Sequence, residues 1–159
     1  MSDPTTHKGM HDNRSMPPGK IIPELVYDDL DSAVRWLCQV FGFKERLRIG
    51  NHRSQLVLED ASMIAVGKNS SPEIKGNYPE QPHAARQADH SIMVRLKDLE
   101  HHFQRATQFG AKVINPPTDF PYGERQYSVE DIGGHLWTFS QSIADVDPED
   151  WGGRLNLQL

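Results

Sequence analysis

One pattern in this sequence occurs twice, about 70 residues apart, and it limits the possible folds more than any other feature. Residues 29–44 run from Asp-Leu-Asp to Phe-Gly-Phe-Lys, and residues 98–112 run from Asp-Leu-Glu to Phe-Gly-Ala-Lys. Each copy is followed by a Glu-Asp pair, at residues 59–60 and 130–131. A repeated unit of this size is a supersecondary module that cannot bury its apolar face alone. We therefore expect two modules that pack together, with room for a ligand between them.

Charge and cysteine content narrow the possible partners. The chain of 159 residues has a formal net charge of −5, and its basic residues are scattered along the sequence. Nucleic-acid binding needs a clustered basic surface, so we expect a small-molecule ligand and no nucleic-acid partner. The single cysteine, Cys38, cannot form an internal disulfide, and the N-terminus lacks the apolar stretch of a signal peptide. No stretch is long and apolar enough to cross a membrane, and we expect a cytoplasmic protein.

Each half of the sequence predicts the same order of elements, β-α-β-β-β. In the first half, Asp29 or Asp31 offers a helix N-cap, and Gly42 ends the helix. In the second half, residues 98–109 form the helix, and we expect His101 and His102 in its first turn to be solvated. The expected strands, four in each half, are residues 21–27, 43–49, 53–58, 62–66, 90–96, 111–115, 124–130 and 135–140.

Composition divides the chain into five segments. Residues 1–19 are polar and contain several prolines, which predicts a disordered tail. Residues 20–67 and 90–142 form the two modules, and residues 68–89 form a linker rich in Ser, Pro, Gly and Asn. Residues 143–159 form a docking tail with Trp151 as its aromatic anchor, on the chain itself or on a second copy. One domain then covers residues 20–153.

The second half carries the clearest resemblance to a known family. The relevant phrases are residues 90–99 (HSIMVRLKDL), 121–127 (PYGERQY) and 129–137 (VEDIGGHLW). Paired βαβββ modules with these phrases resemble the vicinal oxygen chelate superfamily, which contains glyoxalase I, extradiol dioxygenases and the bleomycin- and fosfomycin-resistance proteins. The resemblance covers residues 20–153. It implies an α+β fold in which two tandem modules form a curled, cup-like eight-stranded mixed sheet with the helices outside, and it implies a homodimer.

The resemblance also locates the positions at which metal-dependent members place their ligands. Seven residues before the aspartate that leads into each helix, this chain has Ile22 and Ser91, and seven residues after Asp131 it has Thr138. Residues 63–68, which contain the fourth position, include no His, Glu, Asp or Gln. His90 adjoins the Ser91 position, but strand alternation turns it to the opposite face. Since a catalytic divalent metal needs imidazole or strong oxygen ligands, we expect no metal and no other cofactor.

Strand alternation predicts which side chains line the cup instead. An inward Arg95 needs an anionic partner, which is either Glu24 or a ligand. The facing of Arg125 is ambiguous, although its phrase lies near the pocket mouth in the family. The candidate pocket residues are Ile22, Glu24, Ser91, Met93, Arg95, Arg125, Gln126 and Thr138.

Three functions remain open from the sequence. The first is a metal-free small-molecule-binding protein of the glyoxalase/bleomycin-resistance type, with no catalytic residue. The second is an enzyme of the same superfamily, a lyase or isomerase with an unusual metal site or with Glu24 as a metal-independent base. The third is a structural module whose cup is filled by its own side chains. The fold hosts all three classes, so the site must decide among them.

Overall fold

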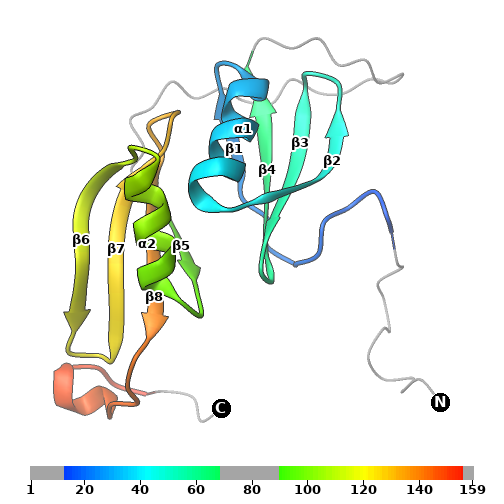
Figure 1. Cartoon of the computed structure of the whole chain (residues 1–159). Coiled ribbons are helices and arrows are strands. Elements are labelled where there is room, and N and C mark those ends of the chain that lie inside the picture. The colour runs from blue at the N-terminus through cyan, green and yellow to red at the C-terminus, as the bar shows by residue number, and fades with distance from the viewer. Residues whose placement is uncertain (1–12, 69–89, 156–159) are drawn as a thin grey trace.

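The computed structural model describes residues 13–68 and 90–155 (Figure 1). The expected linker at residues 69–89 and most of the expected N-terminal tail, residues 1–12, lie outside the described residues. The first module contains β1 (Glu24–Tyr27), α1 (Leu30–Phe41), β2 (Lys44–Ile49), β3 (Arg53–Leu58) and β4 (Ala61–Gly67). The second contains β5 (Ser91–Arg95), α2 (Leu99–Gln108), β6 (Lys112–Phe120), β7 (Glu124–Glu130), β8 (Leu136–Ser142) and a short 3₁₀ helix, η1 (Pro148–Trp151).

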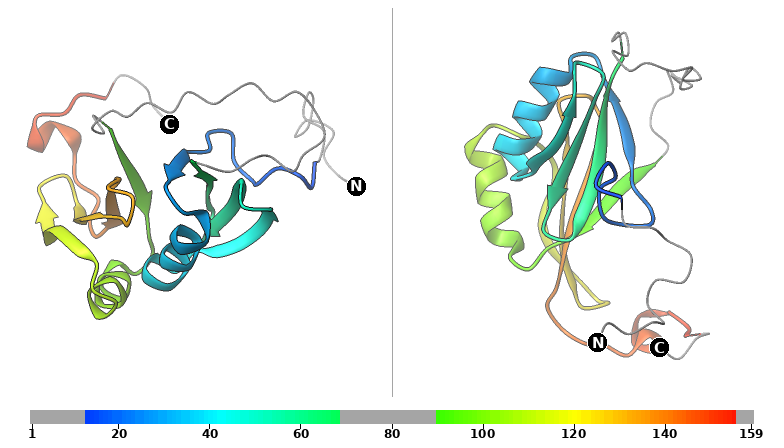
Figure 2. Two further views of the ribbon diagram at one scale, coloured as in Figure 1. Left: turned by 90° about the horizontal axis from the view of Figure 1, so that it is seen from above. Right: turned by 90° about the vertical axis from the view of Figure 1, so that its right-hand side faces the viewer.

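The strands form two mixed sheets of four, one from each module. The strand orders are β1-β4-β3-β2 and β5-β8-β7-β6. In each sheet the first strand pairs in parallel with the last, and the other pairs are antiparallel. The two α-helices, α1 and α2, cover the same side of the two sheets (Figure 2). The expected α+β fold of two tandem βαβββ modules is therefore confirmed.

The helices begin and end where the sequence predicts. Asp29 has the extended backbone of an N-cap, and Gly42 ends α1 in the left-handed conformation with φ 81°. At α2, the Asp98 carboxylate accepts a hydrogen bond from the His101 N–H at 3.1 Å. The buried face of α1 is an apolar stripe that includes Val34, Leu37 and Phe41. Within the described residues, no helix is long and apolar enough to cross a membrane.

Strand alternation separates the core from the free faces. In both modules the side chains that point toward the helices are apolar or aromatic and almost fully buried. Burial of each large side chain of this kind stabilises the fold by about 1.5–3 kcal/mol. Those contributed by β1, β5, β7 and β8 are Leu25, Tyr27, Val94, Tyr127, Val129, Trp137 and Phe139.

Asp131 anchors a hydrogen-bond network that joins the two modules. Its Oδ2 accepts hydrogen bonds from the Tyr27 hydroxyl of β1 at 2.7 Å and from Trp137 Nε1 at 2.9 Å. Its Oδ1 accepts from the backbone N–H groups of Gly133 and His135, both at 2.9 Å. A Cβ on Gly133 would lie 2.8 Å from the Tyr27 ring, so the turn between β7 and β8 approaches β1 closely. The aspartate of the repeated phrase is therefore a structural clamp between modules.

His102 is buried at the same junction, and the expectation that it is solvated is wrong. Its Nε2 lies 2.8 Å from the Phe41 carbonyl oxygen of the first module, and its Nδ1 lies 2.5 Å from the Tyr127 hydroxyl. A carbonyl oxygen only accepts, so Nε2 carries the proton and Nδ1 accepts from Tyr127. Burial lowers the pKa of His102 to about 4, which keeps the ring neutral near pH 7. The sequence could not indicate this, because the Phe41 carbonyl comes from the other module.

Strand β6 is longer than the predicted residues 111–115 because it continues through Pro116 and Pro117 to Phe120. Proline removes a backbone donor, which argues against a strand when it is read from sequence. Here β6 is the edge of its sheet, and its pairing with β7 shifts register between Asn115 and Thr118. An edge strand with an irregular pairing accommodates both prolines.

Candidate functional site

The second sheet presents a polar surface on the side away from the helices, which we call the second inner face. On β5, Ser91, Met93 and Arg95 alternate with the strand's core residues and are exposed. On β8, Thr138 lies in register with Met93, and Ser140 lies in register with Arg95. Residues in register on neighbouring strands point to the same face. The structure thus brings four predicted site residues together on this face.

A row of hydrogen bonds crosses the second inner face between β7 and β8. Gln126, the fifth predicted residue placed here, donates from Nε2 to Ser140 Oγ at 3.0 Å. Ser140 in turn donates to Glu124 Oε1 at 3.0 Å. Ser128 Oγ and Thr138 Oγ1 lie 3.1 Å apart. These polar side chains hold one another in place, as in a preformed binding surface.

Glu124 is the functional candidate that the sequence analysis missed. Its side chain is 19% exposed, and it supplies a carboxylate to the second inner face. The signal was present, because Glu124 precedes Gln126 by two residues on the same strand and therefore shares its facing. Glu124 was not predicted because it begins its strand, and a charged residue at the end of a strand is usually solvated.

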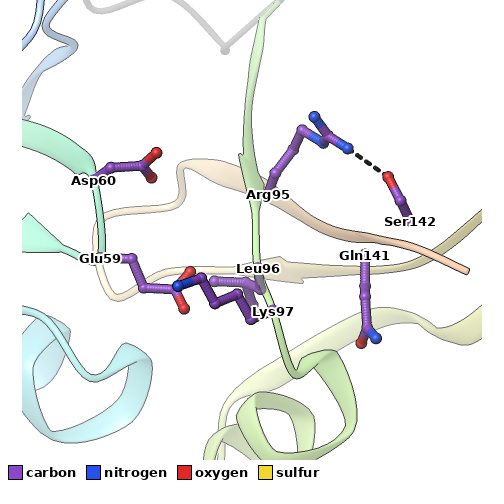
Figure 3. A pocket seen from close by; sticks show the side chains of 7 residues that line it. All are labelled: Glu59, Asp60, Arg95, Leu96, Lys97, Gln141 and Ser142. Carbon is purple, nitrogen blue, oxygen red and sulfur yellow. Dashed lines mark hydrogen bonds between the residues drawn. The ribbon is translucent and has the colours of Figure 1, made fainter.

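Arg95 ends β5 beside a hollow of about 680 Å³ between the modules (Figure 3). Its guanidinium hydrogen-bonds to Ser142, and Nε lies 3.7 Å from Glu124 Oε1. At that distance the Glu124 contact is an ion pair without a direct hydrogen bond. The Arg95 side chain is 72% exposed, so much of its donor surface remains accessible.

The walls of this hollow come from both modules. The turn between β3 and β4 of the first module supplies Glu59 and Asp60, and the ends of β5 and β8 supply the rest. Figure 3 shows Asp60 and Arg95 on separate elements, with the Arg95 side chain extending toward Ser142. The lining residues are Glu59, Asp60, Arg95, Leu96, Lys97, Gln141 and Ser142.

The corresponding face of the first sheet is covered by the chain itself. Arg46 donates from Nη2 to the Arg14 carbonyl oxygen at 2.8 Å, and Gln55 donates from Nε2 to the Ser15 carbonyl oxygen at 2.7 Å. Pro17 is buried. Part of the expected tail thus packs on the first module, and we call residues 14–17 the N-terminal strap. The strap thus occupies part of the inner face of the first sheet.

Two predicted residues of the first module lie apart from the second inner face. Glu24 forms an ion pair with Arg53 on β3, so Glu24 is not the partner of Arg95. Ile22 precedes β1 and is partly buried.

Arg125 does not reach the second inner face either. It alternates with Gln126 and therefore shares the facing of Tyr127. Its Nε donates to Asp119 Oδ1 at 2.6 Å on β6, and this hydrogen bond lowers the pKa of Asp119. Arg125 thus forms an ion pair with Asp119 on the edge strand of the sheet.

The residues at the superfamily's metal positions do not suit a divalent metal. Ile22, Ser91 and Thr138 provide two hydroxyls and no imidazole or carboxylate. The register of β4 against β1 places Ile64 beside Glu24, as Thr138 lies beside Met93, so the fourth position is also apolar. Among the described residues, no group of three or more His, Cys, Asp or Glu side chains could hold a metal ion.

Known proteins share this fold and, in part, this sequence. An uncharacterized protein from Mycobacterium bovis is 26% identical over 139 residues, which cover 86% of this chain and 91% of that protein. The crystal structure of TioX from Micromonospora sp. ML1 matches with a TM-score of 0.63 and 32% identity, covering 79% of this chain and 99% of TioX. Lactoylglutathione lyase from Agrobacterium tumefaciens matches with a TM-score of 0.60 and 19% identity, covering 86% and 99% of the two chains, and shares the fold.

A family model supports the same assignment. The model of the glyoxalase/bleomycin resistance protein/dioxygenase superfamily matches residues 22–139, which include both α-helices and nearly all strands of the two modules. The modules, the repeated phrases and this match agree. The chain therefore belongs to the glyoxalase/bleomycin resistance protein/dioxygenase superfamily.

Proposed function

We propose that this protein binds a small anionic molecule on its second inner face and does so without the superfamily's divalent metal. The observation that carries the proposal is Arg95. Its guanidinium is largely exposed beside the hollow of about 680 Å³, and its ion pair with Glu124 is loose. A hollow of this volume is in the range of small-molecule sites. The absence of strong ligands at Ile22, Ser91 and Thr138 favours recognition by Arg95 over recognition by a metal.

The expected binding mode follows from the arrangement of donors. A carboxylate or phosphate can take two parallel hydrogen bonds from the Arg95 guanidinium. Ser142, which already contacts that guanidinium, is placed to donate to the same anion. Met93 and Thr138 adjoin Arg95 on the second inner face and offer apolar and hydroxyl contacts to the rest of the ligand.

The test compares Arg95→Met with a matched control. Lys112→Met removes a cation of the same module with almost the same exposure, 71%, which pairs with Glu130 at 3.0 Å away from the site. A thermal-shift screen of carboxylates and phosphates should find ligands that stabilise the native chain and the Lys112→Met variant. Arg95→Met should abolish these shifts and change the melting temperature without ligand little. Equal shifts in all three proteins, or none with any compound, would contradict the proposal.

Elemental analysis tests the metal-free part of the proposal. Protein purified without added metal should contain well below one divalent metal ion per chain. About one zinc, nickel, iron or manganese per chain, lost on mutation of Ser91 or Thr138, would overturn it.

The second candidate is a metal-independent lyase or isomerase, and Glu124 is the observation that favours it. This carboxylate lies on the open face, accepts from Ser140 and is close to Arg95, whereas Glu24 is held by Arg53. Such a carboxylate can serve as a general base beside a cationic anion-binding group. Glu124→Gln separates the two functions: it should leave binding by a pure carrier nearly unchanged but abolish turnover by an enzyme.

We further propose a homodimer that acts in the reducing cytoplasm. Several large apolar side chains are more than a third exposed, among them Ile114, Ile132 and Ile143, and a second copy would cover such surface. The lone Cys38 supports a compartment without disulfides.

A further inference from the structure

We propose that a second, smaller pocket binds a neutral apolar group that carries one hydroxyl or carbonyl oxygen, with Ser62 as its hydrogen-bond partner. This pocket has a volume of about 260 Å³, and we call it the slot. It lies between the start of β4, strand β5 and the segment that precedes β1. Its lining residues are Pro18, Gly19, Ile21, Pro23, Phe43, Asp60, Ala61, Ser62, Met63, Ile92, Met93, Val94 and Trp137.

The slot is separate from the hollow at Arg95. Of the described residues, the two linings share only Asp60, and Arg95 is not among those that line the slot. Met93 connects the slot with the second inner face, because it lines the slot and precedes Arg95 by two residues on β5. A ligand in the slot can therefore be tested independently of the site at Arg95.

The lining residues determine which kind of ligand group the slot can bind. It is mostly aliphatic and aromatic, including the buried rings of Phe43 and Trp137, which favours an apolar group. Among the described residues, no lysine or arginine lines it, so no described cation would compensate a buried anion. Asp60 is exposed and also lines the hollow at Arg95. The apolar group must therefore be neutral.

Ser62 supplies the specific polar contact. Its Oγ is buried and has no hydrogen-bond partner among the residues that the structure describes. Buried hydroxyls are normally paired, and Ser62 is a lining residue of the slot, so its unpaired hydroxyl indicates a missing partner. A hydroxyl donates one hydrogen bond and accepts others, so it can pair with either a hydroxyl or a carbonyl oxygen. A single hydroxyl, that of Ser62, in an otherwise apolar slot therefore selects a ligand with one oxygen atom next to Ser62.

Methyl NMR of the full chain labelled at its methionine methyl groups tests this directly. Met63 and Met93 line the slot, whereas Met16 does not and serves as an internal control. Single Met→Leu variants assign the signals. The probes are phenol and toluene, which have nearly the same size and differ in one hydroxyl. Both should shift the Met63 and Met93 signals and leave Met16 unchanged, with phenol binding about five-fold more tightly because of one net hydrogen bond.

Ser62→Ala should reduce this five-fold preference to about one while both probes still bind. The change removes a hydroxyl that has no partner among the described residues, so the variant should fold. Ser54→Ala is the matched control: Ser54 is also buried, but its Oγ donates to Glu45 at 3.1 Å away from the slot, and the preference should persist.

Three outcomes overturn the inference: no shift of Met63 and Met93, equal binding of phenol and toluene, or a preference that survives Ser62→Ala. Arg95→Met should leave the phenol response unchanged. If phenol does not bind as expected but anions still bind in an Arg95-dependent way, only the inference about the slot is refuted. Loss of anion binding with a normal phenol response refutes the proposed function alone.

Discussion

At the scale of single residues, buried polar side chains at the junction between the modules form hydrogen bonds with groups of the other module. The His102 ring binds the Phe41 carbonyl, and the Tyr27 hydroxyl binds Asp131. Burial raises the pKa of Tyr27 well above its usual value, and the Asp131 carboxylate adds to this, so Tyr27 stays a hydrogen-bond donor. Such contacts specify how the modules pack, because an unpaired buried partner is costly.

The depressed pKa of His102 predicts how stability depends on pH. In the unfolded chain a histidine titrates near pH 6.5, whereas burial lowers the pKa of His102 to about 4 in the folded chain. Between these two pH values the unfolded chain binds a proton at this histidine and the folded chain does not. The contribution of His102 to the free energy of unfolding is therefore complete above pH 6.5 and is lost as the pH falls toward 4. The loss is at most about 3 kcal/mol. Urea unfolding at pH 7 and pH 4.5 measures it.

His102→Gln tests the assignment, because a glutamine amide can still donate to the Phe41 carbonyl and does not titrate. Its free energy of unfolding should change less between pH 7 and pH 4.5 than that of the native chain. His101→Gln, on the neighbouring position of α2, should retain the native pH dependence. The same dependence in all three proteins would contradict the role of His102.

Asp131 gives the second prediction at this scale. Asp131→Asn replaces a carboxylate oxygen that accepts two hydrogen bonds with an NH₂ group that can only donate, so it should lower the free energy of unfolding by about 3 kcal/mol. Tyr27→Phe removes only one donor and should cost about 1–2 kcal/mol. Chemical denaturation measures both values. Equal effects of the two changes would argue against Asp131 as the centre of the network.

At the scale of elements, strand alternation predicted the facing of most side chains correctly. Leu25 and Tyr27 on β1, and Trp137 on β8, are buried toward the helices, opposite to the cup residues predicted on the same strands. The pattern failed where a partner comes from far along the chain. Glu24 pairs with Arg53 of β3, and the hollow at Arg95 depends on the β3–β4 turn of the other module. Local periodicity contains no information about either contact.

The turn between β6 and β7 gives a prediction for an element. Gly123 has φ +84°, and a Cβ there would lie 2.2 Å from the Ala144 carbonyl oxygen. The Gly123 carbonyl oxygen also accepts a hydrogen bond from the Ile143 N–H at 2.8 Å, which fixes the end of β8 to this turn. Gly123→Ala should therefore lower the free energy of unfolding by about 2–4 kcal/mol, from backbone strain plus the clash.

Gly110→Ala is the control for this turn. Gly110 also has a positive φ, +75°, but no atom lies within 4 Å of the added Cβ. Only the conformational cost of about 1 kcal/mol applies there. If both variants lose the same stability in chemical denaturation, the close approach to Ala144 does not constrain the turn.

At the scale of the whole molecule, the two halves of the duplicated fold have diverged. The N-terminal strap lies on the first module, where Arg46 and Gln55 hydrogen-bond to its backbone. On the second inner face, Gln126 instead hydrogen-bonds to Ser140 of its own module. The repeat in the sequence predicted two equivalent modules and a cup between them. It could not predict this asymmetry, because the strap lies outside the repeated unit.

The last prediction concerns assembly. Light scattering at micromolar concentration should give twice the chain mass of 18.0 kDa, because exposed apolar side chains such as Ile132 and Ile143 favour a second copy. Trp151 packs edge-on against Tyr122 of its own chain, with ring centroids 5.4 Å apart. Deletion of residues 147–159 should therefore leave the dimer mass unchanged. A fall to the monomer mass on deletion would mean that the tail spans two copies, and a monomeric native chain would contradict the dimer itself.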